Sequence, residues 1–179
     1  MPILGIIASS RLTTPATAYE SISTVTVGSG GTSEITFSSI PATYAHLQIR
    51  GFVKDNATNG NLQLKYNSTA LTRSHDILGE GSGTPAASTD SGVAVIYNQR
   101  TNTGQFVVIL DILNYANTTT NKTFRVLSGG DANGAGRIRF GSGFLISTSA
   151  ISSLSMAFNS GGGTFPEYTQ FALYGIKGA

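Results

Sequence analysis

The residues that could act as a general base near neutral pH are two histidines, His46 and His75, in a chain of 179 residues. Nucleophilic catalysis needs a base within hydrogen-bond reach of the nucleophile. Ser74, His75 and Asp76 are consecutive, and neighbouring side chains diverge instead of relaying a proton. The Gly-X-Ser-X-Gly elbow of α/β-hydrolases is absent. We therefore predict that the protein is not an enzyme; a triad of His75, a distant serine and Asp111 is the alternative left open.

A second candidate site is a loop of oxygen ligands for a metal ion. Asp131, Asn133 and Gly136 match the start of a calcium-binding loop. However, Ala135 stands where a third oxygen ligand belongs, and Ser142 stands where a bidentate glutamate would close the site. We interpret the segment as a turn whose residues tolerate a left-handed backbone, and we predict neither a metal nor another cofactor.

Phosphate and sugar chemistry have weaker support. Gly79, Gly81 and Gly83 lack the following Lys and Ser/Thr of a phosphate-binding loop. Nothing in the spacing of the turn carboxylates selects the pair that glycoside cleavage requires; they are Asp55, Glu80, Asp90 and Glu167. The chain has no tryptophan for a sugar platform, and we expect these aromatic residues in the core or in turns: Tyr66, Tyr97, Tyr115, Phe165 and Tyr168. Lectin-like binding is kept as an alternative.

The composition favours protein contacts over nucleic acid or membrane. Charged residues make up 11% of the chain, against about 25% in average globular domains, and low charge favours association. The 11 Lys and Arg are scattered and form no run that would neutralise many phosphates, so we expect no nucleic-acid binding. The apolar run near the N-terminus is too short for a secretory signal or a membrane span. There is no cysteine for a disulfide or a thiolate metal site.

The most hydrophobic stretch of the chain is Gln105 to Tyr115. It is rich in β-branched and aromatic residues and is interrupted by one charge, Asp111. This pattern predicts a strand in the middle of a sheet, covered on both faces. An unpaired carboxylate there would be costly, so we expect Asp111 to pair with an arginine such as Arg50 or Arg125, or to face a strand edge.

Short alternating segments separated by Gly-rich and polar turns predict ten strands and no helix. These segments are 19–27, 33–37, 45–53, 62–67, 92–97, 105–115, 122–127, 137–146, 151–158 and 168–176. The spacing is typical of an all-β fold, and we expect an antiparallel, jelly-roll-like sandwich of about 8–10 strands. One such domain, residues 18–179, accounts for the chain length.

Local pattern also suggests partners for some strands. We expect residues 19–27 and 33–37 to form a β-hairpin through the glycine-rich turn between them. Residues 62–67 follow 45–53 after a polar turn, and we expect them to be a hairpin partner as well. Within 45–53 the alternation of apolar and polar residues predicts one buried face and one face that is mostly exposed to solvent.

Residues 1–17 lie outside this periodic body and are expected to form an extended N-terminal arm. Its apolar patch consists of Ile3, Leu4, Ile6 and Ile7, the residues that we predict to make assembly contacts. Two interpretations are open, an extra edge strand on the protein's own sheet and an arm that docks on a neighbouring subunit.

Several segments resemble a family of small β-rich structural proteins of tailed bacteriophages. They are the start MPILGIIASS, ITFSSIPATYAHLQIRG at 35–51, KTFRVLSGGDANGAGRI at 122–138, and FALYGIK at 171–177. The similarity reaches both ends of the chain and most strands, but residues 69–104 do not match. The resemblance implies a virion component, made in the host cytoplasm, in the tail, a fibre or the capsid surface. It carries over no functional residues.

From the resemblance and the composition together we expect a structural protein that binds copies of itself, as a homotrimer, and other virion proteins. Residues 1–17 would dock on one of those proteins. The alternative function is receptor binding, in which the loops at 68–92 and 159–166 recognise a glycan on the host surface.

Overall fold

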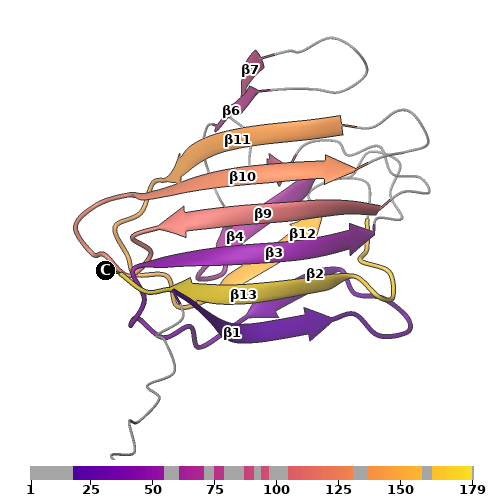
Figure 1. Cartoon of the computed structure of the whole chain (residues 1–179), viewed down its shortest axis with the longest axis horizontal. Coiled ribbons are helices and arrows are strands. Elements are labelled where there is room, and N and C mark those ends of the chain that lie inside the picture. Colours follow the sequence, from indigo (N-terminus) through magenta and orange to yellow (C-terminus); the bar gives the residue numbers. More distant parts are fainter. Residues whose placement is uncertain are drawn as a thin grey trace, which may run out of the picture.

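The computed structural model describes residues 18–54, 61–70, 75–78, 87–90, 94–96, 105–130, 137–158 and 163–178. These residues form strands and turns, without a helix, and all strand pairs are antiparallel (Figure 1). The predicted all-β class is therefore confirmed. The predicted arm, residues 1–17 with Ile3, Leu4, Ile6 and Ile7, lies outside the described residues.

The larger sheet has eight strands within the described part of the chain. Their order is β1 (Tyr19–Thr26), β13 (Gln170–Ile176), β3 (His46–Lys54), β9 (Gln105–Leu113), β10 (Lys122–Gly130), β11 (Arg137–Leu145), β6 (His75–Leu78) and β7 (Ala87–Asp90). The four strands β3, β9, β10 and β11 are nine residues long. Because β3 pairs with β9 along its whole length, the centre of this sheet is a regular ladder (Figure 1).

The smaller sheet lies behind the larger one in Figure 1. Its strands are β2 (Glu34–Phe37), β12 (Leu154–Phe158), β4 (Leu62–Tyr66), β5 (Thr69–Ala70) and β8 (Ala94–Ile96). The path runs β2-β12-β4-β5, and β8 also pairs with β4. The chain passes from one sheet to the other between β1 and β2, and again between β2 and β3.

Both predicted hairpins are wrong. Strand β1 pairs with β13 in the larger sheet, whereas β2 pairs with β12 in the smaller one. The segment between β1 and β2 is held by the C-terminal part of the chain, since Val27 N donates to Thr169 O at 2.8 Å and Thr32 N to Phe165 O at 3.0 Å. Strand β4 pairs with β12 and β8 and not with β3, and the strand with which it forms a hairpin is the following β5. Alternation shows which face of a strand is buried, but it does not identify the neighbouring strand.

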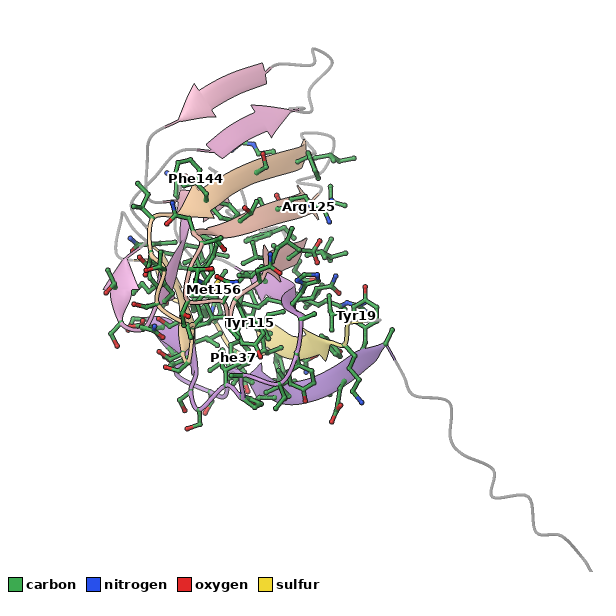
Figure 2. The ribbon with its side chains drawn as sticks, turned by 90° about the vertical axis from the view of Figure 1, so that its left-hand side faces the viewer. Tyr19, Phe37, Tyr115, Arg125, Phe144 and Met156 are labelled. Carbon is green, nitrogen blue, oxygen red and sulfur yellow. The ribbon has the colours of Figure 1, made fainter. Side chains whose placement is uncertain are left out.

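One hydrophobic core contains side chains from both sheets. The larger sheet contributes Leu47, Ile49, Leu110 and Phe124, among others, and the smaller sheet contributes Ile35, Phe37, Leu64 and Met156. Figure 2 shows Phe37 and Met156 in the space between the sheets. Burial of this apolar surface is the main stabilising term for a cysteine-free fold.

The side of the smaller sheet that faces solvent carries an ion pair. Lys65 Nζ lies 3.2 Å from Glu34 Oε1, and both side chains are partly exposed. The Ser155 hydroxyl also donates to Glu34 Oε1. This hydrogen bond, followed by the nearby Lys65, lowers the pKa of the Glu34 carboxyl below its ordinary value of 4.5.

We expect Glu34→Gln to weaken the loss of stability that the protein suffers in acid. Since the folded state lowers the Glu34 pKa, its contribution is complete above about pH 4.5 and is lost as the pH falls through the lowered value. The contribution should stay below about 1 kcal/mol because the ion pair is partly exposed. Urea unfolding at pH 7 and at a series of values below pH 4.5 measures it. Parallel pH profiles for the two proteins would contradict the prediction.

Candidate assembly surface

The larger sheet has one face covered by the core and one face that points away from the smaller sheet. We call this second side, on strands β1, β13, β3, β9, β10 and β11, the outer face. Paired residues of neighbouring strands lie side by side on the same face of a sheet. The register therefore arranges the outer face in rows, of which one contains Gln48, Asp111, Arg125 and Ser142. Figure 2 shows Tyr19 and Arg125 on this side of the molecule.

The outer face is unusually apolar for a surface. Ten large hydrophobic side chains are exposed in the described part of the chain, and eight of them belong to the outer face. These eight are Tyr19, Phe52, Val107, Ile109, Leu127, Ile138, Phe140 and Phe144. Large contiguous apolar patches are rare on soluble monomers and typically mark sites of interaction.

The sequence analysis did not predict this surface, and strand β9 shows the reason. Its position in the middle of a sheet, between β3 and β10, confirms one part of the prediction. The predicted cover on both faces is wrong, because burial alternates along the strand. Val108 and Leu110 are in the core, whereas Val107 and Ile109 remain 54% and 39% exposed. The continuous hydrophobic run combines a core face with an apolar outer face.

Asp111 is paired on the outer face, which confirms the predicted structural role of this carboxylate. Arg125 Nη2 lies 3.6 Å from Asp111 Oδ2. Gln48 Nε2 donates to Asp111 Oδ1 at 2.7 Å, and Arg50 Nε donates to Gln48 Oε1 at 2.7 Å. These contacts join four side chains from three adjacent strands. They fix the carboxylate between an amide and a guanidinium.

Arg50 continues this polar row toward the edge of the sheet. Its Cζ atom lies 5.1 Å from the ring centroid of Tyr174 and 5.3 Å from that of Tyr19. Both distances are within the range of a cation-π interaction. At the edge, Lys177 Nζ lies 2.9 Å from Glu20 Oε2. The side chains of Gln48, Arg50, Asp111 and Arg125 are thus held in defined positions by contacts within one chain.

The residues considered for catalysis are not brought together. His46 Nδ1 accepts a hydrogen bond from the Asn114 backbone N at 3.1 Å, which is a structural contact. His75 and Asp76 belong to β6, three strands away from Asp111 in β9. Three strand spacings correspond to about 14 Å, which exceeds the reach of a direct His75–Asp111 hydrogen bond. No described part of the chain therefore assembles the triad left open by the sequence.

The other predicted site residues have different outcomes. Tyr66, Tyr115 and Phe165 are buried, and Tyr168 lies exposed in a turn, which confirms the expected core and turn positions. Of the carboxylates expected in turns, Glu167 lies in a turn, but Asp90 is the last residue of β7, so its predicted turn position is wrong. Tyr97, Asp55, Glu80 and the loop of Asp131, Asn133 and Gly136 lie outside the described residues. Among the residues that are described, no group of three His, Asp or Glu is placed to hold a metal ion. No helix in the described ranges has the length and hydropathy of a membrane span.

The geometry of the outer face is suited to contact with another protein. It combines a regular ladder, large apolar side chains and a short polar row, the features of a protein interface core with specific polar contacts. Sequence reasoning identified Asp111 and its arginine partner but missed the surface around them. The sequence contained one sign of this apolar surface, because Phe52 is on the side of its strand that was expected to face solvent.

No protein-family model, curated protein or solved structure matches this chain.

Proposed function

We propose that the protein is a structural component of a tailed-phage virion, in the tail, a fibre or the capsid surface, and that it acts through assembly contacts. The apolar outer face is the observation that carries the proposal, because a free monomer gains nothing from exposing it. The sequence resemblance to phage structural proteins supports the location in the particle. The low proportion of charged residues supports sustained contact with neighbouring subunits.

We also propose that the two sheets form a jelly-roll sandwich. Strands β1-β13-β3-β9 would be one four-stranded sheet and β2-β12-β4-β8 the other. In support, β1, β2, β3 and β4 alternate between the sheets in chain order, and so do β12 and β13. Strands β10, β11, β6 and β7 then extend the first sheet. Jelly rolls are found in capsid and lectin domains, so the fold alone does not decide between assembly and glycan binding.

The proposed function predicts that the chain is found in purified particles, and that its N-terminal arm is needed to reach them. Deleting residues 2–11 should leave the fold intact and abolish incorporation, because the arm is proposed to dock on another virion protein. Mass spectrometry of density-purified particles measures incorporation, and circular dichroism of the purified variant measures folding. A full-length chain absent from particles would overturn the function, whereas normal incorporation of the folded deletion variant would overturn only the role of the arm.

Receptor binding is the competing function. Most of its predicted binding loops, 68–92 and 159–166, lie outside the described residues. A glycan array probed with the purified protein separates the two functions. Binding that is lost when these loops are mutated would favour the receptor-binding module.

A further inference from the structure

The outer face has the dimensions of a complete protein interface. Six strands about 4.8 Å apart span about 24 Å, and nine residues at about 3.3 Å each span about 30 Å, which gives a projected area of about 700 Å². A stable interface buries about 800 Å² of each partner. A surface of about this size would therefore cover the face, and the eight-stranded sheet of a second copy is large enough to do so.

The charges at the centre of the eight-stranded sheet form a self-complementary pair. Asp111 on β9 and Arg125 on β10 are directly paired in the ladder, with 3.6 Å between their charged groups. A two-fold axis parallel to the strands and between β9 and β10 keeps every row in place and exchanges the two strands. Each Asp111 then lies opposite the partner's Arg125, and each Arg125 opposite the partner's Asp111. Isologous contacts require this kind of self-complementarity.

The same axis matches the apolar residues. Ile109 and Leu127 are paired in the ladder, so each lies opposite the other in the second copy. Phe52 on β3 lies opposite the partner's Ile138 on β11. Sheets that pack face to face keep their strands within about 30° of each other, which this axis permits.

We infer that the outer face binds the outer face of a second copy, and that the two copies are related by a two-fold axis between β9 and β10. This inference deepens the proposed assembly function and rests on it. It replaces the predicted homotrimer as the basic contact, although three such pairs could still assemble around a three-fold axis. The axis sets β3, β9, β10 and β11 against the same four strands of the second copy, and β13 and β1 against its β6 and β7. The pair buries the exposed apolar side chains of those four strands and places the Asp111–Arg125 pairs of the two copies against each other.

Light scattering coupled to size-exclusion chromatography tests the inference with purified full-length chains. The wild-type protein should have twice the 18.6 kDa mass of one chain, or an even multiple of it. Asp111→Lys places only cations at the axis and Arg125→Glu places only anions, so each variant alone should dissociate at least about tenfold more readily. An equimolar mixture should recover the paired mass, because each cation then meets an anion of the other variant.

The mixing experiment distinguishes contact between chains from repair within one chain, since neither variant repairs its own ion pair. Glu34→Lys and Lys65→Glu, at the 3.2 Å ion pair of the smaller sheet, are matched controls that should leave the mass unchanged. Leu127→Glu should separate the copies without altering the Asp111–Arg125 pair, and circular dichroism verifies that each variant is folded. A monomeric or strictly trimeric wild type, or a mixture that stays dissociated, would overturn the pairing. Incorporation of a dissociated variant into particles would overturn the pairing's role while leaving the proposed function intact.

Discussion

Phe171→Ala will lower the free energy of unfolding by about 3–5 kcal/mol, as expected for deleting a buried aromatic ring. Phe171 lies on β13 with no exposed surface. Its ring packs edge to face against Phe165, with 5.7 Å between the centroids and an interplanar angle of 81°. The ring also fills the space above Gly51, its ladder partner on β3. Removal of the ring should leave a cavity beside Phe165 and Gly51.

Gly51 gives this prediction a second test. A Cβ atom at this position would lie 2.5 Å from Phe171 Cε1 and 2.7 Å from Val108 Cγ1, so Gly51→Ala alone should cost about 1–3 kcal/mol by overpacking. In the Gly51→Ala/Phe171→Ala double variant the clash with the ring is absent and only the contact with Val108 Cγ1 remains. The double variant should therefore lose less stability than the two single losses added together.

Urea unfolding of the four proteins measures this coupling. All samples need the same chain concentration, since association adds a concentration-dependent term to stability. Ile146→Ala is a suitable control because Ile146 is about half exposed, and it should change stability by less than about 1 kcal/mol. Strict additivity of Gly51→Ala and Phe171→Ala would show that the ring and Gly51 do not pack as the structure describes.

The sequence was informative where one strand could be considered alone. The alternation of 45–53 predicted the buried Leu47, Ile49 and Val53 of β3, and these side chains have no exposed surface. Residues 105–115 were correctly placed at the centre of a sheet, and Asp111 was correctly paired. Each of these inferences depends on local periodicity or on the cost of burying a single charge. Both can be judged from residues that are close together in the chain.

The sequence could not identify features that depend on distant segments. The glycine-rich turn after β1 is compatible with a hairpin, and only the contacts of Val27 and Thr32 with the C-terminal part of the chain direct β2 to the other sheet. An apolar residue such as Ile109 has the same hydropathy whether it faces the core or a partner. The strands β6 and β7 were missed because their short segments are not periodic. The outer face could therefore not be predicted from hydropathy patterns alone.

The buried environment of Lys122 is a further feature that the residue type alone does not predict. Sequence reasoning counted it among the scattered charges, yet the side chain is fully buried. It alternates with Thr123 and shares the core side of β10 with Phe124 and Val126. Its ammonium group donates to three backbone carbonyls, those of Asn117 at 2.5 Å, Thr120 at 2.9 Å and Ser147 at 3.4 Å. One cation thus ties the β9–β10 turn to the end of β11.

Lys122→Met should therefore lower the free energy of unfolding by about 2–4 kcal/mol, although methionine retains most of the packing volume. Hydrogen bonds to a charged group contribute about 1.5–3 kcal/mol, and carbonyls left without a donor in a buried site add a further cost. Lys65→Met is the matched control, because Lys65 makes a partly exposed ion pair that contributes less than about 1 kcal/mol.

Urea unfolding measures both variants, and hydrogen exchange of the 114–121 amides locates the effect. Faster exchange in this turn of the Lys122→Met protein, with little change in the strands of the smaller sheet, is the expected pattern. Equal losses for Lys122→Met and Lys65→Met would contradict the prediction, because a buried ammonium held by three carbonyls cannot be replaced by water as easily as an exposed one. The turn would then be stabilised by Asn117, whose Oδ1 accepts from the backbone N atoms of Thr119 and Thr120 at 2.7 and 2.9 Å.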